Sequence, residues 1–279
     1  MTYIKDSIYH TSLPILIIDK NKLYTSKYQF IGHGEEGSIF KYGNKKAIKL
    51  FDSFMEREKL PYKFTKIEEL ARIKDKNFCF PEGLAGYLDL KKEGYYMNFV
   101  TPMEKYPNFT QLAVLKDMKK IFEYVLIADK AIERIHKKGI VIGDIKGDNI
   151  LIDKCGEVKF IDTDNYAYLD YDYDLTPCRS KWYKQVYNKE ISGKDNDIFV
   201  YTMLVLNYFL NGSLIKFARN NEFFKQFINS LNVSNEVKDG LRIILSDAPN
   251  KPYVGKILKK INFEEELLNK DNLRKLNNV

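Results

Sequence analysis

The 279-residue sequence predicts an α+β fold, in which a small lobe built on an antiparallel β-sheet with one helix precedes a larger, mainly helical lobe. Up to Val100, short runs of β-branched and aromatic residues alternate with glycine-containing turns, as in strands joined by hairpins. After Thr101-Pro102, longer segments carry apolar residues at helical spacing. The composition, 44% apolar and 30% charged, is that of a folded chain.

The N-terminal elements are expected to be strands. Residues 1–27 should form an extension that packs on the small lobe, with one strand at 15–19. Residues 38–42 and 46–51 are predicted to pair as a hairpin, because Gly43-Asn44 between them suits a tight turn.

The small lobe proper is expected to cover residues 28–100. One helix, 62–74, interrupts its strands, since its apolar residues recur on a single helical face. Strands at 84–90 and 95–100 should form a second hairpin around the turn 91–94.

The large lobe is expected to cover residues 101–279. It should begin with a long amphipathic helix, 112–138, which Gly139 ends. A strand-rich stretch, 140–161, follows, and helices continue towards the C-terminus. No internal repeat or long linker interrupts this order.

Charge and cysteine usage exclude several classes of protein. The net charge of +7 is spread along the chain, and no dense basic stripe indicates nucleic-acid binding. The three cysteines and three histidines are scattered, which argues against a structural zinc site and suits a reducing compartment. The longest apolar stretch, 199–210, is too short to span a bilayer. We therefore expect a cytoplasmic protein without membrane association.

A glycine pattern is the first candidate for chemistry. Gly32, Gly34 and Gly37 form a G-x-G-x-x-G sequence, and glycines of this kind let the backbone approach phosphates closely. An ordinary glycine-rich turn is the competing explanation. A dinucleotide fingerprint would be followed by a helix, whereas a hairpin is expected here. That hairpin carries Lys49 on its second strand, between two apolar residues.

The segment 142–152 is the stronger candidate. It places Asp144, Lys146 and Asn149 between two apolar strand segments, which is costly unless the polar groups are used. In phosphoryl transfer a carboxylate orients the acceptor hydroxyl, a lysine neutralises the γ-phosphate and a carboxamide oxygen binds Mg²⁺. Asp148 is expected to be a solvated loop residue.

A third candidate is Asp162, at the end of an apolar strand. A carboxylate in this position can hold a hard cation such as Mg²⁺, or it can cap a turn. It follows Asp144 closely enough for a short hairpin to bring both carboxylates to one cleft. Asp164 could bind a second metal ion or cap the turn, and the turn is slightly favoured.

In order and spacing, these motifs resemble the protein kinase superfamily over about residues 28–260, most closely the bacterial protein Ser/Thr kinases. The resemblance implies a two-lobed kinase fold with ATP and Mg²⁺ as cofactors. It makes Asp144 and Lys146 catalytic, and Asn149 and Asp162 the metal ligands. The residues that the resemblance assigns to nucleotide binding are Gly32, Gly34, Gly37, Ile39, Ala47, Lys49, Met97, Asn98 and Val100.

The resemblance also implies supporting residues. Residues 98–100, after Met97, resemble the hinge whose backbone bonds adenine, and Asp197 resembles the aspartate that braces the catalytic loop. A helix glutamate usually pairs with the strand lysine. Glu68 and Glu69 lie at a suitable distance in sequence from Lys49, but the helical register would put Lys66 there instead.

The sequence departs from the kinase pattern in two loops. Ile142-Gly143-Asp144 replaces H-R-D, and without the arginine we expect activity that does not require activation-loop phosphorylation. Asp162-Thr163-Asp164 replaces D-F-G. The acidic segment 165–177 is either a solvated loop or a regulatory one, with candidate phosphosites at Tyr168, Tyr171, Tyr173 and Thr176.

These residues predict a protein kinase that transfers the γ-phosphate of ATP to a Ser or Thr hydroxyl, with a protein as the expected acceptor. Lys146 favours this reading, because protein Ser/Thr kinases typically carry a lysine there. Gly143 favours the alternative, a small-molecule phosphotransferase of the aminoglycoside or choline kinase type. A catalytically inactive pseudokinase scaffold is an alternative of another class.

Overall fold

Two compact units make up the chain in the computed structural model. Unit 1 comprises Met1–Thr101 together with Ile161–Asp164, and unit 2 comprises Pro102–Phe160 together with Asn165–Val279. The four residues 161–164 thus belong to unit 1, although the chain on both sides of them belongs to unit 2. The structure describes residues 12–34, 36–52, 60–87, 92–105, 107–114, 117–168, 187, 193–209 and 221–261.

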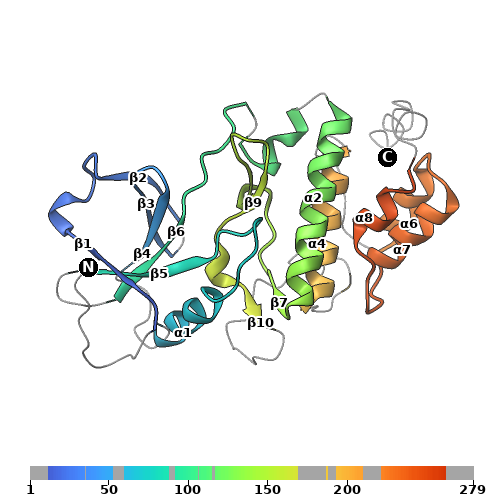
Figure 1. Cartoon of the computed structure of the whole chain (residues 1–279). Coiled ribbons are helices and arrows are strands. Elements are labelled where there is room, and N and C mark those ends of the chain that lie inside the picture. The colour runs from blue at the N-terminus through green and yellow to red at the C-terminus, as the bar shows by residue number, and fades with distance from the viewer. Residues whose placement is uncertain are drawn as a thin grey trace. The chain divides into compact units, whose positions relative to one another are not determined.

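Unit 1 is built on a six-stranded sheet with one helix, α1 (Figure 1). The strands lie in the order β1-β5-β6-β4-β3-β2. Their bounds are β1 Ile15–Ile18, β2 Tyr28–His33, β3 Gly37–Tyr42, β4 Lys46–Phe51, β5 Pro81–Tyr87 and β6 Lys92–Asn98.

The sheet is mixed, which corrects the expectation of a purely antiparallel sheet. The neighbouring pairs from β5 to β2 are antiparallel, but β1 runs parallel to β5, with Ile15 opposite Leu84. A parallel pair needs a long connection between its strands. Here most of unit 1 lies between β1 and β5 in sequence, so the connection is long enough for the first strand to join the sheet edge in parallel.

The β3–β4 hairpin forms as expected and positions Lys49. Gly43 in its turn has φ +58°, a conformation that glycine adopts without strain. β4 lies inside the sheet, and Lys49 is opposite Ile39 on β3 and Tyr95 on β6. Side chains alternate between the two faces of a strand. Lys49 therefore shares the face of Ala47, which packs in the same buried cluster as residues of α1.

Helix α1, Leu60–Leu70, is shorter at its C-terminal end than the expected helix 62–74. After Leu70 the chain turns, and Asp75 accepts a hydrogen bond from the backbone N–H of Asn77 at 3.0 Å. This side-chain hydrogen bond satisfies a backbone N–H without a helical hydrogen bond, so it competes with continuation of the helix. The buried face of α1 carries two lysines, Lys63 and Lys66, among apolar residues.

Unit 2 is mainly helical, and α2 and α4 lie side by side in it (Figure 1). Asp117 caps α2 by accepting from the backbone N–H of Lys120 at 3.0 Å, so this helix starts later than the expected residue 112.

Short antiparallel pairs join β7 to β10 and β8 to β9. The 3-10 turns of the chain are η1 Lys20–Lys22, η2 Phe109–Val114, η3 Gly147–Asn149 and η4 Thr163–Asn165. The remaining bounds are α2 Met118–Lys137, β7 Ile140–Val141, β8 Ile150–Ile152, β9 Val158–Phe160, β10 Ala167–Tyr168, α4 Gly193–Phe209, α6 Asn221–Ser230, α7 Asn235–Ile244 and α8 Val254–Leu258.

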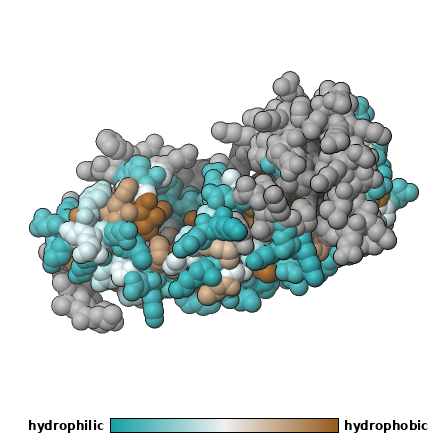
Figure 2. Space-filling model, turned by 90° about the horizontal axis from the view of Figure 1, so that it is seen from above, coloured by the Kyte–Doolittle hydropathy of each residue, from teal (hydrophilic) through white to brown (hydrophobic). Residues whose placement is uncertain are grey.

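Hydrophilic residues dominate the described part of the face in Figure 2, with hydrophobic residues exposed in smaller areas. Among the described residues, no helix combines the length and apolar character needed to cross a membrane. Of the candidate phosphosites, Tyr171, Tyr173 and Thr176 lie outside the described residues, as do residues 88–91 of the second expected hairpin.

Candidate functional site

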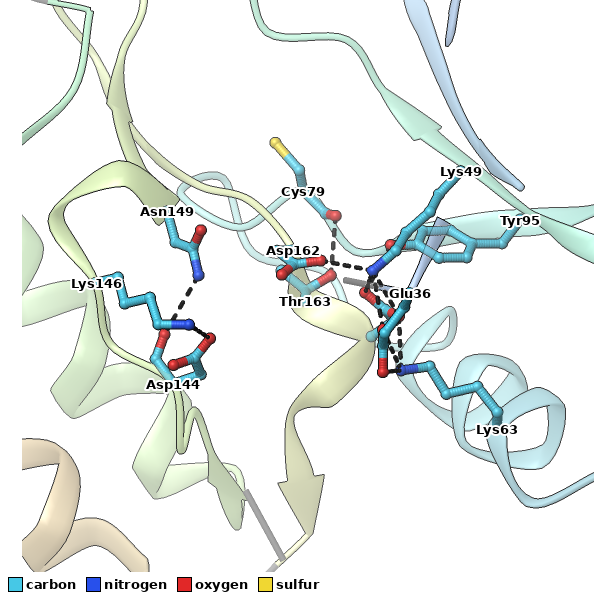
Figure 3. Close-up of polar contacts among 11 residues, drawn as sticks. Glu36, Lys49, Lys63, Cys79, Tyr95, Asp144, Lys146, Asn149, Asp162 and Thr163 are labelled. Atoms are coloured by element: carbon cyan, nitrogen blue, oxygen red, sulfur yellow. Dashed lines mark hydrogen bonds and ion pairs between the residues drawn. The ribbon is translucent and has the colours of Figure 1, made fainter. Parts of the chain in front are cut away.

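Lys49 is the centre of a buried charge cluster in unit 1. Its side chain projects from the middle of β4 and the residue is only 4% exposed. Its Nζ lies 2.8 Å from Asp162 Oδ1, 3.1 Å from Asp164 Oδ1 and 3.1 Å from Glu36 Oε2 (Figure 3). Burial alone would lower the pKa of Lys49, but the three carboxylates outweigh it and raise the pKa above its ordinary value.

Asp164 is the most deeply buried member of this cluster, at 0% exposure. Its Oδ1 accepts from the Tyr95 hydroxyl at 2.8 Å, and its Oδ2 lies 2.8 Å from Lys63 Nζ. Burial would raise the pKa of Asp164, but Lys63 and Lys49 hold it well below its usual range. Asp164 is thus a structural counter-ion shared by two lysines, a role that the sequence did not indicate.

Asp162 differs from Asp164 in both exposure and conformation. Its side chain is 33% exposed, and its backbone has φ +57°, a left-handed conformation that aspartate tolerates better than most residues. Burial and the neighbouring Asp164 raise its pKa, while Lys49 opposes them. Next to it, the Thr163 hydroxyl donates to the backbone oxygen of Cys79 at 3.0 Å and anchors the segment within unit 1.

Helix α1 contributes cations to the cluster. Lys63 Nζ lies 2.9 Å from Glu36 Oε2 as well as 2.8 Å from Asp164. Lys66 is 4% exposed, and burial and its neighbour Lys63 lower its pKa to about 8. Within the described part of the chain, the acidic partners of Lys49 include neither Glu68 nor Glu69.

The expected pairing of Lys49 with Glu68 or Glu69 is therefore absent among the described residues. Lysines occupy the buried face of α1, and the opposing carboxylates come from the glycine-rich turn and from residues 161–164. Lys66, which the helical register put opposite the strand lysine, lies on this buried face, but Lys63 is the residue that shares carboxylates with Lys49.

The glycine-rich turn between β2 and β3 contains two kinds of glycine. A Cβ on Gly37 would lie 2.0 Å from the backbone oxygen of Leu50, so close strand packing requires glycine there. A Cβ on Gly32 would meet nothing within 4 Å, and one on Gly34 only the oxygen of Gly37 at 3.9 Å. Neither packing nor a positive φ requires glycine at these two positions. Their bare backbone suits a ligand that approaches the turn closely.

The expected adenine-contacting residues gather beside Lys49. Ala47 lies opposite Met97 in the sheet, and both belong to one buried cluster, with Ile39 and Val100 packed against it. The Phe99 backbone N–H donates to the oxygen of Lys45 at 2.8 Å, which engages one donor of the expected hinge. Asn98 continues the β6 ladder, and its Oδ1 accepts from Lys46 Nζ at 3.1 Å.

The second group of expected site residues lies in unit 2, in the loop between β7 and β8. The Lys146 ammonium lies 2.8 Å from Asp144 Oδ2, and Asn149 Nδ2 donates to the Asp144 backbone oxygen at 3.4 Å (Figure 3). The Asp144 and Lys146 side chains are 21% and 57% exposed, so both can meet a solvent-borne partner. Asp148 is exposed and accepts from Asn108 Nδ2 at 3.1 Å.

Asp197 of α4 holds this loop from its buried side. Its carboxylate accepts from the backbone N–H groups of Ile142 and Gly143 at 2.7 and 2.8 Å. His136 Nε2 lies 2.8 Å from Asp197 Oδ2, and His136 Nδ1 lies 3.0 Å from the Tyr253 hydroxyl. Gly143 has φ +75°, which explains a glycine before Asp144. The involvement of His136 and Tyr253 was not evident from the sequence, because a tertiary contact brings them together.

Asp162 and Asn149, taken separately, each offer an oxygen that suits magnesium, whereas Asp164 does not. Asp162 in unit 1 keeps a third of its side chain exposed, and Asn149 in unit 2 is half-buried. Carboxylate and carboxamide oxygens are suitable Mg²⁺ ligands, and Mg²⁺ often takes the rest from phosphates and water. Asp164 does not fit a second metal ion, because lysine and tyrosine donors already engage both of its oxygens.

Comparison with protein-family models and with curated protein sequences found no match to this chain. Its function is therefore inferred from the residues above and their geometry.

Proposed function

We propose that this protein is an ATP- and Mg²⁺-dependent phosphotransferase of the protein kinase type, which transfers the γ-phosphate to a Ser or Thr hydroxyl of a protein. The strongest support is the 2.8 Å contact of Lys49 with Asp162, which are 113 residues apart. Such a contact is expected where a phosphate-binding lysine and a metal-binding carboxylate serve one nucleotide. The open glycines beside this cluster add further support.

In this proposal unit 1 binds the nucleotide. Ile39, Ala47, Met97 and Val100 provide apolar surface for the base, and the backbone from Asn98 onward provides polar contacts. Gly32, Gly34 and Gly37 let the turn approach the phosphates, which Lys49 binds through charge. Asp162 of unit 1 and Asn149 of unit 2 are the residues that would hold magnesium, which would supply positive charge to the phosphates.

The loop in unit 2 handles the acceptor. Asp144 accepts or orients the proton of the acceptor hydroxyl, and Lys146 neutralises the transferred phosphate. Lys146 is exposed enough to move from Asp144 towards an arriving phosphate. Because Asp197 and the His136 ring hold the loop without an arginine, the proposal includes activity that is independent of activation-loop phosphorylation.

The test is transfer of labelled γ-phosphate from ATP, with Mg²⁺, to the protein itself and to generic basic proteins. Asp144→Asn should reduce transfer at least about a hundredfold, since a positioned general base typically contributes that much. Asp148→Asn is the matched control, because it makes the same change at an exposed site in the same loop. It should transfer phosphate at close to the wild-type rate.

Other outcomes would replace the proposal. Consumption of ATP only when small hydroxylated metabolites are present would favour a small-molecule phosphotransferase. Nucleotide binding without transfer to any acceptor would favour a pseudokinase. Equal loss of transfer in both variants would remove Asp144 from its proposed role.

A further inference from the structure

Glu36 occupies an unusual position for a residue of a phosphate-binding turn. It immediately precedes Gly37, and its carboxylate bridges two of the buried lysines of the cluster, Lys49 and Lys63. Glu36 Oε2 lies 3.1 Å from Lys49 Nζ and 2.9 Å from Lys63 Nζ. The Glu36 carboxylate thus pairs with the ammonium groups to which a nucleotide phosphate would bind.

Among the three carboxylates on Lys49, Glu36 is the one best placed to leave. Asp164 is fully buried and bonded by two lysines and Tyr95. Asp162 belongs to the short segment that Thr163 anchors. The Glu36 side chain is 30% exposed, unlike that of Asp164, and its turn, unlike the segment of Asp162, contains glycines whose surroundings are open.

Lys66 provides a second, independent observation. It lies one helical turn after Lys63 on the buried face of α1 and is 4% exposed. Among the described residues no hydrogen bond or ion pair reaches its ammonium group. Burial and the charge of Lys63 lower its pKa to about 8, so its charged form lacks adequate compensation.

The sum of the charges in the cluster also favours an anion in place of Glu36. Among the described residues of this cluster three lysines face three carboxylates, and removal of the Glu36 carboxylate changes the sum of these six charges from zero to +1. Buried charges are stable only when they are paired, so the excess favours an incoming anion.

Building on the proposed function, we propose that Lys63 is a second phosphate-binding lysine, and that Glu36 occupies the phosphate position on Lys49 and Lys63 until a polyphosphate displaces it. Helix α1 then binds the nucleotide directly, through a cation, where other kinases use a helix glutamate to orient the strand lysine. Glu36 lowers the affinity for phosphates, and every nucleotide must compete with it.

The test measures binding to the full chain by calorimetry, with MgATP, adenosine and inorganic tripolyphosphate as separate probes. Glu36→Gln should tighten binding of MgATP and tripolyphosphate about tenfold, as expected if the carboxylate occupies the lysines roughly nine-tenths of the time. Binding of adenosine should not change. Glu222→Gln is the matched control, because it removes the same charge from an exposed ion pair with Lys225 and should leave all three affinities unchanged.

A second variant tests Lys63 itself. Lys63→Gln should weaken MgATP and tripolyphosphate about tenfold while adenosine still binds, and Lys63→Arg should retain most of the affinity. If Lys63→Gln fails to fold, because Asp164 loses a counter-ion, the Glu36→Gln measurement decides alone. The proposal is overturned if Glu36→Gln leaves the phosphate probes unchanged, weakens them, or tightens adenosine equally.

These outcomes separate the two proposals. Tighter tripolyphosphate binding by Glu36→Gln, without phosphate transfer to any acceptor, would support the displacement of Glu36 and reject the phosphotransferase. Transfer that depends on Asp144, with phosphate affinity unaffected by Glu36→Gln, would do the reverse.

Discussion

Two buried aspartates, one in each unit, have pKa values displaced in opposite directions. Asp164 in unit 1 is 0% exposed, and the two ammonium groups of Lys63 and Lys49 keep its pKa well below the ordinary value of 3.8 against the effect of burial. Asp129 on α2 in unit 2 is 5% exposed, and burial raises its pKa to about 6, with a backbone hydrogen bond from Gly255 opposing it. Burial is similar, so the contacting cations decide the sign.

Two of the buried lysines of unit 1, Lys49 and Lys66, follow the same rule. Lys49 contacts three carboxylates, and its pKa is raised, whereas Lys66 is equally buried without such contacts, and its pKa falls to about 8. A buried charge in this protein is therefore stabilising only where its partner is within bonding distance. The comparison predicts which substitutions of buried acids lower the free energy of unfolding and which raise it.

The largest effect should come from Asp164→Asn. Loss of this carboxylate removes the one fully buried partner that Lys49 and Lys63 share and leaves them the partly exposed Glu36, which should cost about 3–5 kcal/mol of unfolding free energy. The measurement is urea unfolding from pH 3 to pH 8. Because the folded-state pKa of Asp164 is depressed, its contribution is full above the unfolded pKa of about 3.8 and declines as the pH falls below it.

The wild type and Asp164→Asn should therefore differ most above about pH 5 and converge in acid. Asp19→Asn is the control, since Asp19 forms an exposed ion pair with Lys22 in the same unit and should matter little. A difference between wild type and Asp164→Asn that persisted unchanged at pH 3 would contradict the ion-pair explanation.

Asp129→Asn should have the opposite and smaller effect, a gain in stability. A pKa displaced from 3.8 to about 6 corresponds to at most about 3 kcal/mol of destabilisation at neutral pH. Because the folded-state pKa is raised, wild-type stability should fall as the pH rises from about 4 to about 6 and then level off. The asparagine variant should lack this decline in urea unfolding experiments, and an unchanged pH profile would show that Asp129 is not a strained charge.

Local sequence signals predicted the parts of the molecule that local interactions determine. Gly43-Asn44 marks the β3–β4 turn, and that hairpin in turn places Lys49 on a buried strand. The loop that carries Asp144 could also be predicted, because its three polar residues lie between two apolar segments, which the structure has as strands β7 and β8. In these cases the residues that form the structure are neighbours in the sequence.

Features that depend on distant residues were not predicted. The parallel pairing of β1 with β5 requires knowledge of where the chain returns, which no local pattern contains. The role of Asp164 depends on Lys63 and Tyr95, which come from two other elements. The helical register indicated that Lys66 lies on the face of α1 towards the strand lysine. The carboxylates that offset the positive charge of this face come from other elements and could not be identified from the sequence.

Asp197 extends the comparison to a buried aspartate that backbone N–H donors hold. In Asp197→Asn an NH2 donor replaces one of the two carboxylate oxygens and faces the backbone N–H of either Ile142 or Gly143. The expected cost is about 1–2 kcal/mol in urea unfolding.

Asp195→Asn is a matched control on the same helix, because Asp195 also accepts two backbone N–H groups, from Asn250 and Lys251 at 2.8 and 2.9 Å. Asp195→Asn should lose less stability, because its hydrogen bonds are more exposed, and only Asp197→Asn should lower kcat for phosphate transfer, since only Asp197 holds the loop that carries Asp144. The affinity for adenosine should be unchanged in both, because the proposed contacts to the base lie in unit 1. If the two variants lowered kcat equally, Asp197 would affect phosphate transfer only through the stability of unit 2. It would then have no separate role in positioning Asp144.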